Sequence, residues 1–196
     1  MAQYKKNEVK DKIDQAAMEV FSKKGYQNTK IADISEKAGI SVGNVYRYYK
    51  GKEEILRELI PEDFLQQLQE SLNKKLCSWK DADESNGHFL ASKQFIGLLV
   101  EKKEQLAILI AGCEGTEYSN FKDQIINYMT DLFLSRYGGK LKFNSMKNKE
   151  IIRLIYEKHF EMMAEVFKQP GDKKELQEKI MVINNYHVKG ITSLIK

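Results

Sequence analysis

The segment Thr29–Lys52 constrains the fold more than any other part of the chain, because it has the pattern of two short helices joined by a tight turn. Its first part repeats apolar residues at spacings of three and four, Ile31, Ile34 and Ala38, which predicts an amphipathic helix that ends before Gly39. Glycine adopts the left-handed backbone conformation that ends a helix at the lowest steric cost. We therefore expect a turn at this glycine and a second helix after it.

Capping residues mark both helix starts. Thr29 is expected to cap the first helix with its hydroxyl, and Asp33 suits the positive end of that helix. Ser41 is expected to cap the second helix, Val42–Tyr48. Two short helices around a glycine turn form a helix-turn-helix unit, which places its second helix in the major groove of DNA.

The second helix is rich in hydrogen-bond donors and flat rings, while Val45 and Tyr49 form its predicted buried side. Asn44 and Arg47 suit adenine and guanine edges, and Val42 suits a thymine methyl group. Tyrosine hydroxyls and lysines suit phosphate oxygens. The residues expected at DNA are Thr29, Lys30, Ser41, Val42, Gly43, Asn44, Tyr46, Arg47, Tyr48 and Lys52. A solvated, tyrosine-rich helix pair in an ordinary bundle is the alternative.

Charge is distributed unevenly along the chain. Residues 1–52 hold 11 Lys and Arg against 6 Asp and Glu, whereas the remaining residues hold 21 against 22. The basic character therefore lies in the segment with the helix-turn-helix pattern, as binding to a phosphate backbone requires. A basic surface without a partner would have the same composition.

The run AMEVFSKKGYQNTKIADISEKAGISVGNVYRYYKGKEEIL closely resembles the DNA-binding domain of the TetR/AcrR transcriptional regulators. The resemblance covers about residues 8–58 and implies a three-helix DNA-binding domain followed by a helical domain that binds an effector and forms a dimer. Two positions depart from the family pattern. Gly51 replaces a capping residue, and Pro61 falls inside what the family builds as one long helix, so a kink or break is expected near Ile60.

The rest of the chain has helical spacing and no alternating β pattern, so we predict an all-α protein with domains at 1–52 and 53–196. We expect a first helix over Asn7–Lys24 and loops at 81–87 and 138–146. No run has the apolar length of a membrane span, and the N-terminus lacks a signal-peptide core, so a cytoplasmic location is expected.

The last two predicted helices, 147–168 and 173–195, each carry an apolar stripe. One stripe contains Ile152, Ile155, His159, Met163 and Val166; the other contains Leu176, Ile180, Ile183, His187, Ile191 and Leu194. These stripes either cover the core of a single chain or form a four-helix interface between two copies. The family resemblance favours the homodimer.

No catalytic motif, phosphate-binding glycine loop or metal-ligand spacing is present, so an enzyme, a cofactor and a metal site are not expected. The cysteines and histidines are expected to be structural or interfacial. The resemblance implies a small-molecule site in the second domain, and apolar and aromatic walls suit such sites. The residues expected there are Trp79, Phe89, Cys113, Tyr118, Tyr128, Tyr156, His159, Phe160 and Met163.

These features together predict a homodimeric repressor that binds a quasi-palindromic double-stranded DNA operator and is released by a small-molecule effector. The alternative is a DNA-anchored interaction protein whose second domain binds another protein and no effector.

Overall fold

The computed structural model describes residues 2–77, 93–142, 148–169 and 171–196. Within these ranges the regular structure is helical, apart from one isolated bridge between Leu141 and Ile195, which confirms the all-α prediction. The α-helices are α1 (Ala2–Lys24), α2 (Ile31–Ala38), α3 (Val42–Tyr46), α4 (Lys52–Leu59), α5 (Glu62–Cys77), α6 (Lys93–Glu101), α7 (Lys103–Ala111), α8 (Phe121–Tyr137), α9 (Asn148–Lys168) and α10 (Lys173–Thr192). A short 3-10 helix, Gly138–Lys140, follows α8.

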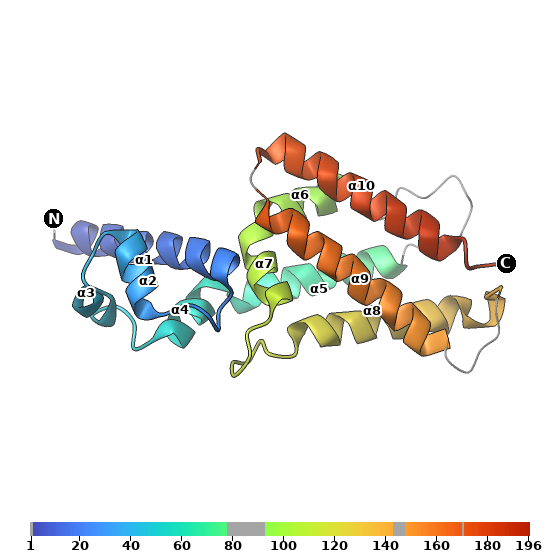
Figure 1. Ribbon diagram of the computed structural model, residues 1–196, viewed down its shortest axis with the longest axis horizontal. Coiled ribbons are helices and arrows are strands. Elements are labelled where there is room, and N and C mark those ends of the chain that lie inside the picture. Colours follow the sequence, from blue (N-terminus) through green and yellow to red (C-terminus); the bar gives the residue numbers. More distant parts are fainter. Residues whose placement is uncertain (1, 78–92, 143–147, 170) are drawn as a thin grey trace.

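Helices α1 to α4 gather at one end of an elongated molecule (Figure 1). One face of α1 is buried, with Ile13, Ala17 and Phe21 fully inaccessible to solvent. Val45 of α3 and Tyr49 are buried against this core, as predicted, and the Tyr49 hydroxyl donates a hydrogen bond to Asp14 of α1. This packing holds α3 at the surface of a small helical unit.

Helices α5 to α10 form the other end of the molecule. α9 and α10 run side by side in opposite directions, and α7 lies at the centre, where it contacts both α1 and α9 (Figure 1). All five residues from Leu106 to Ile110 are buried, because α7 is covered on several sides. α7 therefore connects the two ends of the molecule through its packing.

The helix is interrupted between α4 and α5, as the sequence predicts. α4 ends at Leu59, Ile60 has φ −118° and ψ 71°, and α5 begins directly after Pro61. Proline lacks the backbone donor that a continuous helix needs, and its ring clashes with the preceding turn. α4 packs on α1 and therefore lies with the N-terminal helices. The break at Pro61 comes nine residues after the domain boundary predicted at residue 52.

Other boundaries differ from the prediction. α1 begins at Ala2, five residues before the predicted start at Asn7. The predicted loop at 81–87 and part of that at 138–146 lie outside the described residues. Within the described ranges, no helix has the combination of length and apolar character that crossing a bilayer requires.

Candidate DNA-binding surface and internal cavity

The turn between α2 and α3 has the predicted geometry. Gly39 has φ 67° and ψ 33°, in the left-handed region, and its N–H bonds to the Glu36 carbonyl at 3.1 Å. The Ile40 N–H bonds to the Ser35 carbonyl at 3.0 Å, which closes the end of α2. Ser41 then caps α3, because its hydroxyl accepts the Asn44 N–H at 3.2 Å.

The predicted cap of α2 is wrong by one residue. Thr29 is only 1% exposed, and its hydroxyl donates to the Gly25 carbonyl at 2.8 Å instead of capping α2. Lys30 occupies the N-cap position, and its backbone N–H donates to the Asp33 carboxylate at 2.8 Å. The threonine hydroxyl bonds to the turn after α1. Thr29 therefore lies inside the fold and is not on the surface that is expected to contact DNA.

α3 presents one exposed face. Val42 is 40% exposed and Tyr46 is 55% exposed, whereas Val45 between them is fully buried. Gly43 and Arg47 are also exposed, and Asn44 is half-buried. The helix ends at Tyr46 and not at Tyr48 as predicted. Tyr48 lies beyond the end of the helix and is half-buried.

Three exposed cations of the helix-turn-helix segment have no ion-pair partner in the described part of the chain, namely Lys30, Arg47 and Lys50. Nearby lysines of α1 and α2 are paired, for example Lys24 with Asp33 at 2.9 Å and Lys37 with Glu19 at 2.8 Å. Phosphate contacts need cations that are not already neutralised, so the unpaired set defines the candidate phosphate-binding positions.

Lys52 has a different environment from the one expected of a phosphate ligand. Its ammonium donates to the carbonyls of Tyr26 at 2.8 Å and Thr29 at 3.2 Å, and it lies 4.2 Å from the centroid of the Tyr26 ring. Burial lowers the pKa of Lys52. This lysine ties the start of α4 to the turn before α2, and its donors are occupied within the fold.

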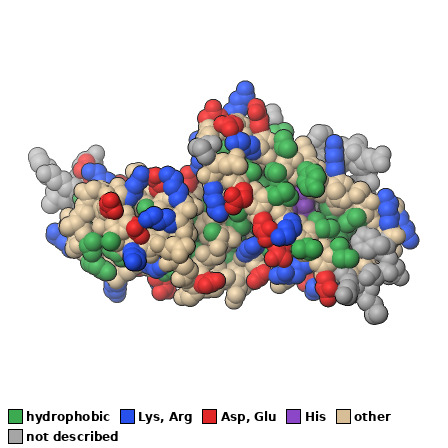
Figure 2. Space-filling view, viewed as in Figure 1, with side chains coloured by type: hydrophobic (Ala, Val, Ile, Leu, Met, Phe, Trp, Pro, Cys, Tyr) green, Lys and Arg blue, Asp and Glu red, His purple; other side chains and the backbone are tan. Residues whose placement is uncertain are grey.

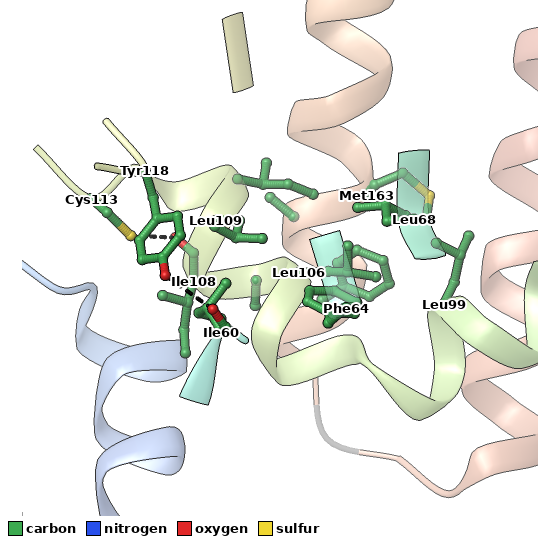
Figure 3. Packing of buried hydrophobic residues seen from close by; sticks show 14 of the residues in the cluster. Ile60, Phe64, Leu68, Leu99, Leu106, Ile108, Leu109, Cys113, Tyr118 and Met163 are labelled. Atoms are coloured by element: carbon green, nitrogen blue, oxygen red, sulfur yellow. Dashed lines mark hydrogen bonds between the residues drawn. The ribbon is translucent and has the colours of Figure 1, made fainter. Parts of the chain in front are cut away.

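The C-terminal helices line a partly open cavity of about 70 Å³. Its described lining consists of Leu68, Leu72, Phe95, Leu99, Leu106, Ile110, Phe121, Ile125, Met129, His159, Phe160, Met163, Phe167 and Asn184. Figure 3 shows Leu68, Leu99, Leu106 and Met163 converging from four helices on this region. A second pocket of about 280 Å³ shares four of these residues and adds Leu65, Gln69, Gln124 and Tyr128.

The residues predicted from sequence for the ligand site are divided between several places. His159, Phe160 and Met163 line the cavity, and Tyr128 lines the second pocket. Tyr156 packs against His187 at 5.1 Å between ring centroids, while Cys113 and Tyr118 lie at the end of α4. Trp79 and Phe89 lie outside the described residues. The aliphatic lining was missed, because apolar residues at helical spacing look the same whether they face a cavity or a filled core.

The two histidines of α9 and α10 stack inside the C-terminal domain. The rings of His159 and His187 lie 4.1 Å apart at an interplanar angle of 29°. Burial lowers the pKa of His159 to about 3 and that of His187 to about 4, so both imidazoles are neutral at physiological pH. Nδ1 of His159 is buried and has no hydrogen-bond partner among the described residues.

A hydrogen bond connects the C-terminal domain to the break after α4. The Tyr118 hydroxyl donates to the Ile60 carbonyl at 3.0 Å (Figure 3). This carbonyl precedes Pro61, and the Phe64 N–H that would pair with it in a continuous helix bonds to the Pro61 carbonyl at 3.1 Å instead. The tyrosine therefore supplies the donor that the proline break removes.

Two further contacts lie beside this bond. Arg57 of α4 pairs with Glu117 at 2.8 Å, and the Gln27 side chain donates to the Glu114 carbonyl. The segment between α7 and α8 therefore contacts both α4 and the turn that follows α1.

The apolar stripes predicted for a dimer interface are mostly buried within the single chain. Ile152, Met163, Ile180 and Ile191 are at most 5% exposed, because α9 and α10 pack against each other and against the core. A different set of large apolar residues is exposed on these helices: Ile151 39%, Leu154 53%, Met181 37%, Val182 66% and Tyr186 69%. Hydrophobic side chains also gather over the C-terminal helices on the face drawn in Figure 2.

The remaining chemistry of the described residues is structural. Cys113 is fully buried, and burial raises the pKa of its thiol to about 11, as expected of a packed cysteine. No group of three or more potential metal ligands occurs among the residues that the structure describes.

The helix-turn-helix region matches a known family. The family model described as "Bacterial regulatory proteins, tetR family" matches residues 13–59. The biofilm operon negative transcriptional regulator IcaR of Staphylococcus epidermidis is 41% identical over 56 residues, which are 29% of this chain and 30% of that protein. The HTH-type transcriptional regulator YfiR of Bacillus subtilis is 35% identical over 136 residues, 66% of this chain and 62% of that protein.

The fold also matches over nearly the whole chain. A TetR-like transcriptional regulator from Rhodococcus sp. RHA1 has a TM-score of 0.51 and 20% identity, covering 94% of this chain and 96% of the other. The chain spans less than two thirds of the length of the curated relatives described above. These relatives are regulators and not enzymes. With its turn geometry and exposed α3, the chain is similar over residues 13–59 to the TetR family of bacterial transcriptional regulators, and its helical fold resembles that of a TetR-like regulator.

Proposed function

We propose that this protein is a homodimeric repressor that binds an operator through α3 and releases it when a small molecule occupies the C-terminal cavity. The observation that carries the proposal is the exposed face of α3, Val42, Gly43, Tyr46 and Arg47, on a helix whose opposite side is buried. An exposed valine and arginine on a groove-sized helix suit a thymine methyl and a guanine edge. The name of the matched relative IcaR, a negative regulator, supports repression.

Fewer residues are proposed to contact DNA than the sequence alone suggested. Val42, Asn44 and Arg47 contact bases, while Lys30, Tyr46, Tyr48 and Lys50 contact phosphates. The buried Thr29 and the internally bonded Lys52 hold the domain together and do not contact DNA. Gly43 allows close approach of the backbone, and Ser41 acts as the cap of α3.

A dimer follows from the size of a single reading helix. α3 has only five residues, which reach too few base pairs for tight binding, whereas two copies about 34 Å apart read successive major grooves. The exposed apolar residues of α9 and α10, including Leu154, Val182 and Tyr186, supply an apolar surface for the second copy. This surface replaces the buried stripes in our proposal.

Ligand release requires that the effector bind better to the form that does not fit the operator. The route runs along α8, because Phe121 and Ile125 line the cavity and Tyr118 lies three residues before Phe121. Tyr118 then holds the Ile60 carbonyl at the end of α4, and α4 packs on α1. A ligand that moves α8 thus moves α4 and changes the spacing of the two copies of α3.

The test of DNA binding uses operator fragments recovered by selection from random DNA. Arg47→Ala is expected to cost roughly 1 to 3 kcal/mol on the preferred site and to relax its specificity. Lys50→Ala is expected to weaken all sequences alike and to lower the slope of log affinity against log salt by about one. Lys173→Ala on α10 removes a charge far from α3 and serves as the control. Unchanged specific binding by Arg47→Ala and Lys50→Ala would contradict the proposed interface.

The exposed apolar residues of α9 and α10 also support a second candidate, a DNA-anchored protein that binds a different protein there and has no effector. Light scattering of the purified chain separates the two. A dimer of the chain itself supports the first candidate, and a stable monomer that still binds single half-sites supports the second.

A further inference from the structure

The described lining of the cavity is almost entirely apolar. None of the described residues that line it is Lys, Arg, Asp or Glu, and most are aliphatic or aromatic. An ion transferred from water into such surroundings loses its hydration without gaining a partner. A carboxylate, phosphate or ammonium group finds no counter-charge among these described residues, which favours an uncharged group for the part of a ligand that lies against them.

One polar atom of a residue that lines the cavity is left without a partner. Nδ1 of His159 is buried and accepts or donates no hydrogen bond among the described residues, although buried polar atoms are nearly always paired. The stacked ring of His187, 4.1 Å away, and the edge of Phe160, 6.3 Å between centroids, restrict the orientation of this imidazole. A ligand that bonds to His159 gains a hydrogen bond that the empty protein does not make.

The protonation state of His159 narrows the matching group. Burial holds the pKa of this imidazole at about 3, so the ring is neutral and has one N–H donor and one bare nitrogen. A hydroxyl both donates and accepts, so it pairs with either nitrogen and either tautomer. A carbonyl pairs only with the N–H, and a hydrocarbon pairs with neither.

The volumes set the size of the ligand. The cavity of about 70 Å³ is smaller than the roughly 150 Å³ that accommodates benzene in a buried apolar site. The second pocket of about 280 Å³ shares Leu68, Leu72, Phe121 and Ile125 with the cavity, and its wall contains Gln69 and Tyr128. A ligand of one ring therefore extends from the cavity into the second pocket between α5 and α8.

We infer that the effector is a compact, uncharged alcohol or phenol whose hydroxyl bonds to the His159 imidazole and whose hydrocarbon part lies between α5, α8 and α9. The inference rests on the proposed function, because it takes this cavity as the effector site. His159, which stacks on His187 and lines the cavity, is then the group that selects the ligand.

The test is direct calorimetric binding to the full-length protein without DNA. The probes are four molecules of matched shape: 4-ethylphenol, ethylbenzene, 4-ethylbenzoate as the anion and 4-ethylbenzylammonium as the cation. We expect 4-ethylphenol to bind at least about tenfold more tightly than ethylbenzene, and the two ions to show no binding. In His159→Phe, the affinity for 4-ethylphenol is expected to fall to that for ethylbenzene, while Lys173→Ala at the exposed start of α10 binds as the unaltered protein does.

A second measurement uses the unaltered protein, so it does not depend on whether His159→Phe folds. Titration with 4-ethylphenol is expected to shift the imidazole nitrogen resonances of His159, and ethylbenzene is not. Equal affinity for 4-ethylphenol and ethylbenzene, tighter binding of either ion, or no binding of any probe would overturn the inference. These outcomes are independent of operator binding, so they are distinct from a failure of Arg47→Ala and Lys50→Ala, which would overturn the proposed function.

Discussion

Replacing Tyr118 by Phe removes one hydroxyl oxygen and tests the connection between the cavity and the helix-turn-helix region, α1 to α4. The ring keeps its packing, because Tyr118 is 8% exposed and phenylalanine has the same shape. The hydroxyl that donates to the Ile60 carbonyl at 3.0 Å is lost. No other change in the chain is required to remove this contact.

The magnitude follows from the position of the carbonyl. Pro61 ends α4, and the Phe64 N–H bonds to the Pro61 carbonyl, so the backbone does not pair with Ile60 in place of the hydroxyl. Leaving a buried carbonyl unpaired costs about 1 to 3 kcal/mol. For a domain of this size, each kcal/mol lowers the melting temperature by about 2 to 4 °C, so we expect a decrease of several degrees.

The assay is thermal unfolding at a fixed protein concentration, because the stability of the proposed dimer would depend on concentration. The matched control is Tyr46→Phe, which removes the same atom from a ring that is 55% exposed on α3, outside the proposed dimer surface, and is expected to change stability by less than about 0.5 kcal/mol. We also expect Tyr118→Phe to bind the operator and yet respond less to a cavity ligand. Its effect on ligand response is the part that a purely local hydrogen bond would not produce.

A double-mutant cycle with Pro61→Ala can refute the reasoning. Alanine restores the backbone donor and allows α4 to continue into α5, in which case the Ile60 carbonyl accepts the Phe64 N–H. The Tyr118 hydroxyl should then contribute less, so the two changes should be non-additive. Additive effects, or a melting temperature of Tyr118→Phe equal to that of the control, would show that the hydroxyl does not compensate for the proline.

Three further predictions follow from the geometry. Lys52→Met should lower stability by about 1 to 3 kcal/mol in denaturant unfolding, through the loss of charged hydrogen bonds to backbone carbonyls, while leaving the salt dependence of operator binding nearly unchanged. Because burial lowers the pKa of both stacked histidines, the unfolded chain binds more protons than the folded one between about pH 6.5 and 4, so stability should fall as pH decreases through this window; unfolding at pH 7.5 and 5 should show a smaller fall in His159→Phe. Val182→Glu combined with Tyr186→Glu should give a helical monomer by light scattering and circular dichroism, and a dimer of unchanged mass would contradict the proposed interface.

The local features of α2 to α4 depend on residues that are neighbours in sequence, so they were predictable from the sequence. Gly39 has the left-handed conformation, Ser41 caps α3, and Pro61 breaks the chain, since each effect involves groups within a few residues of each other. The buried positions Val45 and Tyr49 also follow from helical spacing.

Features that depend on distant partners were not predictable. Thr29 and Lys52 look like DNA contacts in the sequence, yet their donors are taken by carbonyls of the turn after α1. Likewise, the apolar pattern of α9 and α10 indicates a buried face but does not say whether a core or a second copy buries it.

The sequence by itself determined an all-α chain, the site of its turn and the break after α4, because short-range hydrogen bonding and sterics decide these features. Only the tertiary structure decided that His159 and His187, 28 residues apart in sequence, stack beside a cavity, and that the Tyr118 hydroxyl reaches the Ile60 carbonyl 58 residues away. Such contacts depend on how whole helices pack, and packing is set by the sum of many weak apolar contacts that no local pattern records.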